Sequence, residues 1–292
     1  MQASSSSFPR IQSEWLLGLV AVVALVLSGA LLVVYGYAAL SWYHQPFLGV
    51  LPLRTLQVSP NESLTGGEWP ALRVGIQPGD QIDRLDGVDL GSLPVSERLA
   101  KFRQILGAHR VGDRSSVSFL RGPSGPSRPL AAQCMDEPGE PGLRRCGMLV
   151  WLGTMPTGDM VAYFGVGWVC GLVLWLVTTL LLLRQASDPQ VRLIAIVSAV
   201  IVVFLAGRFD TISTHEAGWA WLLLTCLGAG LLVVVAMEFP YRFAFVQQVP
   251  LLGWAPMIVA LALGGASAAL YFSPNTTLNQ AAFVLALGTL IL

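Results

Sequence analysis

Charged residues are scarce in this sequence. Only 12% of the 292 residues are Asp, Glu, Lys or Arg, whereas 54% are hydrophobic, and an ordinary soluble domain has about 25% charged residues. Of the 17 basic and 17 acidic residues, 23 lie between Arg54 and Arg145. This distribution excludes a wholly soluble chain and predicts a membrane protein with one soluble insert.

A surplus of basic charge is also missing, and histidine is rare. The net charge is zero without any basic run, so we expect no nucleic-acid partner. The three histidines, at 44, 109 and 215, are too few and too dispersed to predict a metal site. The stretch "HEAGW" carries Trp219 where a zinc protease needs its second histidine. We therefore expect no catalytic residues, no metal and no other cofactor in this chain.

Long apolar runs fill the rest of the chain. A membrane span needs roughly 20 apolar helical residues, and the first run is too long for a signal peptide, whose apolar region has about 7–15 residues. We expect a short N-terminal segment at 1–14, a first span at 15–43, and a bundle over 159–292 with spans at 161–183, 191–207, 217–238, 249–272 and 278–292. The last span stops with the chain, so we expect a longer protein.

Arginines in the short connections predict the orientation. Arg10, Arg184, Arg192 and Arg242 fall in alternate connections between the expected spans, and short loops rich in Lys or Arg stay in the cytoplasm. Arg208 is the exception. The N-terminus is therefore expected in the cytoplasm and residues 45–157, called the insert below, outside it.

Four cysteines divide between the insert and the spans. Cys134 and Cys146 both lie in the insert, where an oxidising compartment would permit a disulfide. The alternative is a pair of half-buried thiols. Cys170 and Cys226 lie in apolar runs and are expected to pack there.

The insert reads as a small α+β domain. Gln81–Leu85 is a short strand between a Pro-Gly-Asp turn and an Asp-Gly turn. Residues 95–106 place Leu99, Phe102 and Leu106 on one helical face. Further strands are expected over 115–122, 128–135 and 146–153. The fold class is therefore mixed: an all-α bundle of about six membrane helices with an inserted β-rich domain that has one main helix.

The stretch "VGIQPGDQIDRLDGVDL" (74–90) resembles the signature of bacterial PDZ domains, and "VGDRSSVSFLRG" follows where that family has its next strand. "PFLGV" (46–50) is similar to the carboxylate-binding loop of HtrA-type PDZ domains. The resemblance covers about 46–135 and implies a PDZ-like fold. It assigns the turn to Gly75, Pro78, Gly79, Asp80, Asp86 and Gly87.

This resemblance also implies a peptide site. PDZ domains bind an extended peptide as an added strand, with the chain-end carboxylate on backbone amides. The implied residues are Phe47, Leu48 and Gly49 for the carboxylate, Val50 and Leu51 for pairing, and Leu99, Phe102 and Arg103 for the groove. Alternatively, the apolar members simply fill the core. Pro52 departs from the pattern because it lacks an N–H for pairing.

The order of one helix, an extracytoplasmic PDZ-like domain and a helix bundle resembles bacterial multi-pass sensors of the receptor histidine kinase type. This implies an inner-membrane receptor, bound by membrane lipid, that recognises a peptide or protein ligand outside the cytoplasm and signals to a cytoplasmic output domain in a two-component system. Homodimerisation stays open. The alternatives are a regulatory part of a membrane protease and a non-enzymatic envelope scaffold.

Two further features bear on mechanism. The insert joins its flanking spans through the short junctions "SWYHQPF" and "WLGTMPTGDM", so a ligand that reorients it is expected to move the first helix relative to the one beginning near Val161. Asp210, His215 and Glu216 form a polar group near Arg208. They are expected to cap helix ends, with ligand contact as the alternative.

Overall fold

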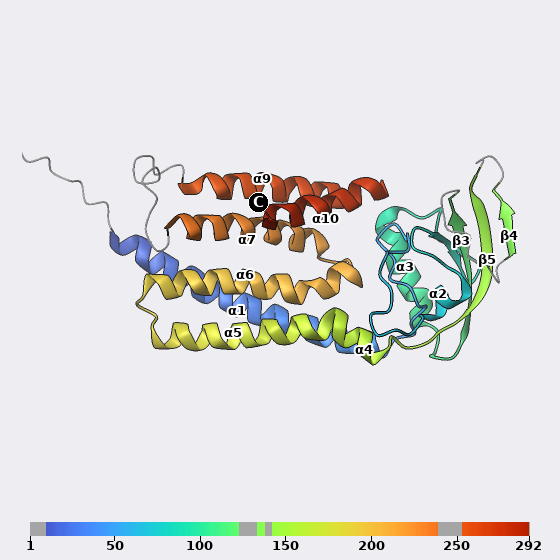
Figure 1. The fold of residues 1–292 in the computed structure, drawn as a ribbon, viewed down its shortest axis with the longest axis horizontal. Helices are drawn as coiled ribbons and strands as arrows, with labels where there is room; N and C mark the ends of the chain where they lie inside the picture. Colours follow the sequence, from blue (N-terminus) through green and yellow to red (C-terminus); the bar gives the residue numbers. More distant parts are fainter. Residues whose placement is uncertain (1–9, 123–132, 138–141, 239–252, 292) are drawn as a thin grey trace, which may run out of the picture.

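The computed structural model describes residues 10–122, 133–137, 142–238 and 253–291. The molecule is elongated, with helices along most of its length and a small α+β domain at one end (Figure 1). Arg242, residues 128–132 of the expected third strand and residues 249–252 of the expected fifth span lie outside the described residues.

The helical part contains long apolar helices. They are α1 (Arg10–Tyr43), α4 (Thr157–Met160), the π-helical turn η1 (Val161–Gly165), α5 (Val166–Arg184), α6 (Pro189–Ile212), α7 (Gly218–Glu238), α9 (Ala255–Tyr271) and α10 (Thr276–Ile291). Four stretches in the described residues are long and apolar enough to cross a membrane: Leu17–Tyr43, Thr157–Arg184, Pro189–Ile212 and Gly218–Met237. The 17-residue α9 is a shorter apolar helix. The chain is therefore a helical membrane protein.

The long helices of the described residues form two groups of three. In the first helix group, α1, α5 and α6 share buried side chains such as Leu25, Leu32 and Val202. In the second, α7, α9 and α10 share a core around Leu222, Cys226 and Tyr271. The two groups lie side by side and are joined where α6 continues into α7 (Figure 1).

Two tryptophans fasten α5 to α1. The indole nitrogen of Trp168 donates a hydrogen bond to the Leu32 carbonyl at 2.8 Å, and its ring lies on Gly36, where a Cβ would come within 2.9 Å of the indole nitrogen. Trp175 repeats the arrangement seven residues later on Gly29, where a Cβ would lie 2.7 Å from the ring. Small residues allow such close approach in membranes, so α1 and α5 pack as one unit.

The insert is an antiparallel five-stranded sheet in the order β2-β1-β3-β5-β4. Its elements are α2 (Pro70–Val74), β1 (Gln81–Leu85), β2 (Val88–Asp89), α3 (Val95–Gly107), β3 (Arg114–Arg121), β4 (Gln133–Asp136) and β5 (Arg144–Trp151). The face of α3 that carries Leu99, Phe102 and Leu106 packs into the core of the sheet. The sequence predicted neither α2 nor β2, because five and two residues are too few for a periodic signal.

Both expected turns are present. Asp86 (φ 50°) and Gly87 (φ 78°) have positive φ and join β1 to β2, as the two central residues of a type I′ hairpin do. The Asp86 carboxylate also accepts the Ser116 N–H at 2.8 Å. In the first turn, Asp80 accepts the Gln77 N–H at 2.7 Å.

A buried ion pair ties the first turn to the sheet. Arg121 on β3 donates from Nε to Asp80 at 2.8 Å and from Nη2 to the Gly75 carbonyl at 2.8 Å. Gly75 itself ends α2 in the left-handed conformation.

Cys134 and Cys146 stand opposite each other on β4 and β5 and are joined by a disulfide. Cys170 is a free, exposed thiol and Cys226 a free, buried one.

Candidate functional site

The groove residues implied by the sequence do come together. Together they line one pocket, between the chain before α2 and the buried face of α3: Phe47, Leu48, Val50, Leu51, Leu99, Phe102 and Arg103. Its volume is only about 40 Å³, far below the roughly 300–1,000 Å³ of ligand pockets. Leu48, Val50, Leu99 and Phe102 also belong to the buried core. The two interpretations of these side chains therefore coexist: the same residues build the core and line a closed groove.

The loop expected to hold a carboxylate is partly engaged. The Phe47 N–H donates to the Gly153 carbonyl at 2.8 Å, so this amide is not available to a ligand in the present conformation. Gly49 has φ 93°, and a Cβ there would lie 2.5 Å from the Ala71 nitrogen. Glycine is required at this position for both reasons. The three-amide carboxylate site stays a prediction, and its first donor is part of a bridge to the end of the insert.

The membrane helices supply part of the groove wall. Trp42, at the end of α1, and Ser213, just after α6, line the same pocket as Leu99 and Phe102. The expected peptide groove thus faces the helices instead of open solvent. The sequence did not single out Trp42 or Ser213 as site residues, because nothing local to either position indicates contact with a domain that folds separately.

Two arginines of the insert reach the second helix group. Arg103 on α3 forms an ion pair with Glu216 at 3.1 Å, where the Glu216 side chain is 72% exposed. Arg54 donates to the Tyr271 carbonyl at 3.0 Å, and its guanidinium lies 4.8 Å from the centre of the Tyr271 ring. The groove side of the insert is therefore tied to α9 and to the start of α7.

The connection between α6 and α7 is organised by Asp210. Its carboxylate accepts the backbone N–H groups of Glu216 at 2.8 Å and Ala217 at 2.9 Å, as well as the Thr214 hydroxyl. Its carbonyl accepts the His215 N–H at 2.6 Å. Such bonds satisfy the amides at a helix start. The capping role expected for Asp210 is therefore confirmed.

His215 is buried in this connection, between the insert and the second helix group. Its backbone has φ 53°, its carbonyl accepts the Tyr271 hydroxyl at 3.0 Å, and neither ring nitrogen has a hydrogen-bond partner within the described residues. Burial lowers the pKa of His215 to about 4, against the opposing effect of the Pro52 carbonyl, and the charges of Arg103 and Arg54 lower it further. The imidazole is therefore neutral at pH 7.

The opposite side of the insert is fastened by Asp159, at the start of the second membrane stretch. One carboxylate oxygen accepts the Leu64 N–H at 2.9 Å, the Thr65 N–H at 3.0 Å and the Thr65 hydroxyl at 2.9 Å. The other accepts the Trp69 indole N–H at 2.7 Å. Asp159 is fully buried. Asp159 was not expected to be a site residue, although it is an acidic residue directly before an apolar run.

An aromatic cluster surrounds this fastening. Trp69 packs edge-on against Phe47 with ring centres 5.2 Å apart, and the Tyr163 hydroxyl donates to the Glu62 carbonyl at 2.6 Å. Phe164 and Phe209 continue the cluster between η1 and α6, with ring centres 4.9 Å apart. The insert and the first helix group therefore share one core at this junction.

No protein-family model, curated protein or solved structure matches this chain. Within the described residues, no three His, Cys, Asp or Glu side chains gather as metal ligands would. The candidate site is a closed groove whose walls come from the insert and from the membrane helices.

Proposed function

We propose that this chain is a membrane sensor module whose PDZ-like insert recognises an extended peptide or a segment of a protein partner. The observation that carries the proposal is the shared groove: Leu99 and Phe102 form one wall, and Trp42 and Ser213 form another. Any ligand that enters this groove must displace the membrane helices from the insert. Recognition and a change in the helix arrangement then become one event.

The PDZ-like identity is supported by the turns and by the main helix. The glycine-rich turn before β1, the Asp86-Gly87 hairpin and the helix α3 follow the order of the family signature along the chain. In that family the ligand adds a strand beside the groove. Here it would lie along residues 48–51, against α3.

The contacts on the two sides of the insert differ in strength. In the Arg103–Glu216 pair the Glu216 side chain is 72% exposed and the Arg103 side chain 28% exposed, and ion pairs that solvent reaches contribute about 0–1 kcal/mol. The Asp159 carboxylate is buried with four donors, and hydrogen bonds to charged groups contribute about 1.5–3 kcal/mol each. The groove side therefore opens first, and the insert turns about the Asp159 side.

The moving parts are the two helix groups. Motion of α1 against α5 was expected from the sequence, but the indole hydrogen bonds of Trp168 and Trp175 join these helices. The insert contacts the first group through Asp159 and the second through Arg54 and Arg103. A ligand shifts this arrangement only by its differential affinity for the open and closed forms, so tight binding alone is not sufficient.

A reversible crosslink tests the proposal. Arg103 and Glu216 meet through the ends of long side chains, so their backbones stand too far apart for a direct disulfide, which needs Cα atoms about 4.4–6.8 Å apart. In the variant R103C/E216C, with Cys170 replaced by Ser and Cys226 by Ala, a bis-methanethiosulfonate reagent should join the two cysteines and hold the groove closed until its links are reduced. A phage library of random C-terminal peptides serves as the probe, applied to the crosslinked and the reduced full chain in lipid nanodiscs. We expect peptides selected on the reduced form to bind the crosslinked form at least tenfold more weakly.

The control places the cysteine two residues away on α3, as K101C/E216C, because residues two apart on a helix do not share a face. This variant should bind the selected peptides equally after treatment with the reagent and after reduction. The proposal is wrong if no peptide is enriched on the reduced form, or if the locked and unlocked forms bind equally well.

A further inference from the structure

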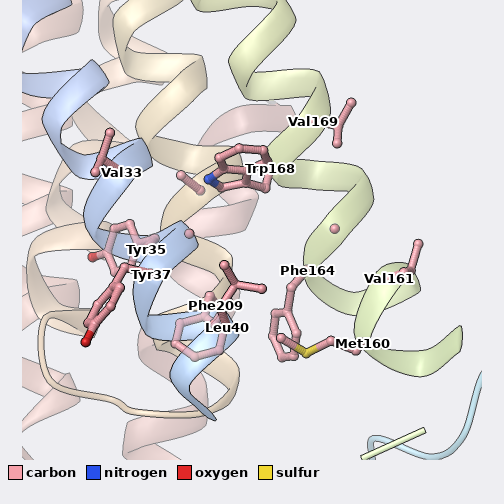
Figure 2. Close-up of a pocket in the computed structure, with 14 residues that line it drawn as sticks. Val33, Tyr35, Tyr37, Leu40, Met160, Val161, Phe164, Trp168, Val169 and Phe209 are labelled. Atoms are coloured by element: carbon pink, nitrogen blue, oxygen red, sulfur yellow. The ribbon is translucent and has the colours of Figure 1, made fainter. Parts of the chain in front are cut away.

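An apolar groove lies between α1 and the start of α5, on the side of the first helix group. Its volume is about 490 Å³, within the range of small-molecule sites. Val33 and Leu40 line it from α1, Phe164 and Trp168 from η1 and α5, and Phe209 forms its back wall from α6 (Figure 2). This groove is separate from the closed groove of the insert.

The lining of this groove is almost entirely carbon. The only polar side-chain atoms on its lining residues are the hydroxyls of Tyr35 and Tyr37 and the indole nitrogen of Trp168, and the indole nitrogen already donates to the Leu32 carbonyl. No charged side chain lines it. A buried water needs two to four polar partners, and a polar or ionic ligand would remain unpaired here. The apolar lining therefore favours a hydrocarbon ligand.

The groove opens toward the surface that faces hydrocarbon. Val33, Leu40, Val161 and Val169 border it and are exposed, and all four belong to the stretches Leu17–Tyr43 and Thr157–Arg184, which can cross a membrane. In Figure 2 the groove runs between the α1 and α5 ribbons from Val33 and Val169 toward Leu40 and Met160. A bilayer supplies acyl chains directly at this opening.

The direction and length of the groove fit one leaflet. Seven residues separate Val33 from Leu40, which is about 10 Å along a helix, and one leaflet of the hydrocarbon core is about 15 Å thick. The groove occupies the end of the spans next to the insert (Figures 1 and 2). We propose that it binds one acyl chain of a bilayer lipid from the leaflet that adjoins the insert.

Local backbone structure creates the space. The π-helical turn Val161–Gly165 follows α4 near the start of the stretch Thr157–Arg184, and such turns recur at functional sites. Gly165 lines the groove without a side chain. An acyl chain here would touch Phe164 and Phe209, which belong to the aromatic core between the insert and the helices. The lipid site is independent of peptide binding but borders the same junction.

Photocrosslinking of the full chain tests the site. The protein is reconstituted in vesicles of phosphatidylethanolamine and phosphatidylglycerol with a trace of phospholipid that carries a diazirine on its acyl chain, and the adducts are mapped by mass spectrometry. We expect yields on residues 33–40 and 160–169 at least fivefold above those on exposed Leu180 of the same helix. This labelling should saturate as the probe fraction rises, whereas labelling at Leu180 should rise linearly.

The variant Gly165→Leu should reduce labelling in the groove at least fivefold. Its backbone is helical, and a Cβ there lies 3.5 Å from the nearest side chain, so the new side chain occupies the groove without a backbone clash. Gly265→Leu on exposed α9, where a Cβ meets nothing within 4 Å, is the matched control and should label as the parent does. Uniform, non-saturating labelling of the parent protein, or unchanged labelling in Gly165→Leu, would overturn the proposal.

Discussion

The indole nitrogen of Trp69 lies 2.7 Å from a carboxylate oxygen of Asp159, and both residues are fully buried. Trp69 belongs to the insert and directly precedes α2, whereas Asp159 opens the second membrane stretch. This bond therefore joins two parts of the chain that are 90 residues apart. It holds the side of the insert that we expect to stay in place while the groove side opens.

Replacement of Asp159 by alanine should destabilise the junction. It leaves the Trp69 indole and the Thr65 backbone N–H without their acceptor, and unsatisfied buried donors cost about 1–3 kcal/mol each. We expect the thermal midpoint of the detergent-purified protein to fall by several degrees. Asp136→Ala is the control, because that side chain is 89% exposed and pairs only at the surface. Equal midpoints for the two variants would contradict this account of the junction.

The Arg121–Asp80 pair should matter for the insert itself. Both side chains are buried, and Arg121 also holds the Gly75 carbonyl. Removing one partner of a buried pair costs about 3–5 kcal/mol because the other charge remains unpaired. Arg121→Met should therefore expose the amides of β1 and β3 to hydrogen exchange at a faster rate. Arg144→Met, at an exposed position of β5, should leave this exchange unchanged.

Because α1 packs closely on α5, replacing one glycine of α1 by alanine should lower the stability of the protein, whereas the same replacement at another glycine should not. In Gly29→Ala the new methyl group would come within 2.7 Å of the Trp175 ring, so the indole must shift, and overpacking of this kind costs about 1–3 kcal/mol. In Gly18→Ala the nearest side-chain atom is 3.5 Å away. Thermal unfolding should distinguish the two variants, and a Gly29→Ala protein as stable as Gly18→Ala would show that the helices are not fastened here.

Acid should weaken the junction through His215. Because burial lowers its pKa to about 4 in the folded chain from an ordinary 6.5, the unfolded chain binds the proton first. The stability that this group contributes is complete above about pH 6.5, falls as the pH drops toward 4, and amounts to about 3 kcal/mol over that window.

The measurement for this effect is the free energy of unfolding between pH 7 and pH 5, compared with that of His215→Gln. The difference between the two proteins should shrink as the pH falls. His44→Gln, at an exposed position, should keep the acid dependence of the parent. A constant difference between the parent and His215→Gln would mean that the imidazole does not stay neutral in the folded chain.

Local sequence signals predicted much of the insert. The Asp86-Gly87 turn, the buried face of α3 and the positions of Cys134 and Cys146 could be read from short-range patterns, because turn geometry and helical periodicity depend on neighbours in the chain. The sequence predicts the ends of α9 and α10 less well, because uniformly apolar segments carry no periodic signal that marks where a helix begins.

The relation of the insert to the helices could not be predicted in this way. The contacts of Trp42, Asp159 and Ser213 with the insert depend on how two separately folded parts pack. The apolar groove depends on a π-helical turn and on the absence of a side chain at Gly165. Phe47 was expected to present its amide to a ligand, but long-range pairing with Gly153 engages that amide.

The most direct test of the central claim is a distance between the two helix groups at the ends far from the insert. Nitroxide labels at Leu183 on α5 and Ile258 on α9, both exposed, report this distance by pulsed electron resonance in nanodiscs, with Cys170 and Cys226 replaced. If the insert couples its groove to the helices, a saturating concentration of a peptide selected on the unlocked protein will shift the distance distribution, and the crosslinked R103C/E216C form will bind that peptide at least tenfold more weakly. Superimposable distributions with and without bound peptide would contradict the account.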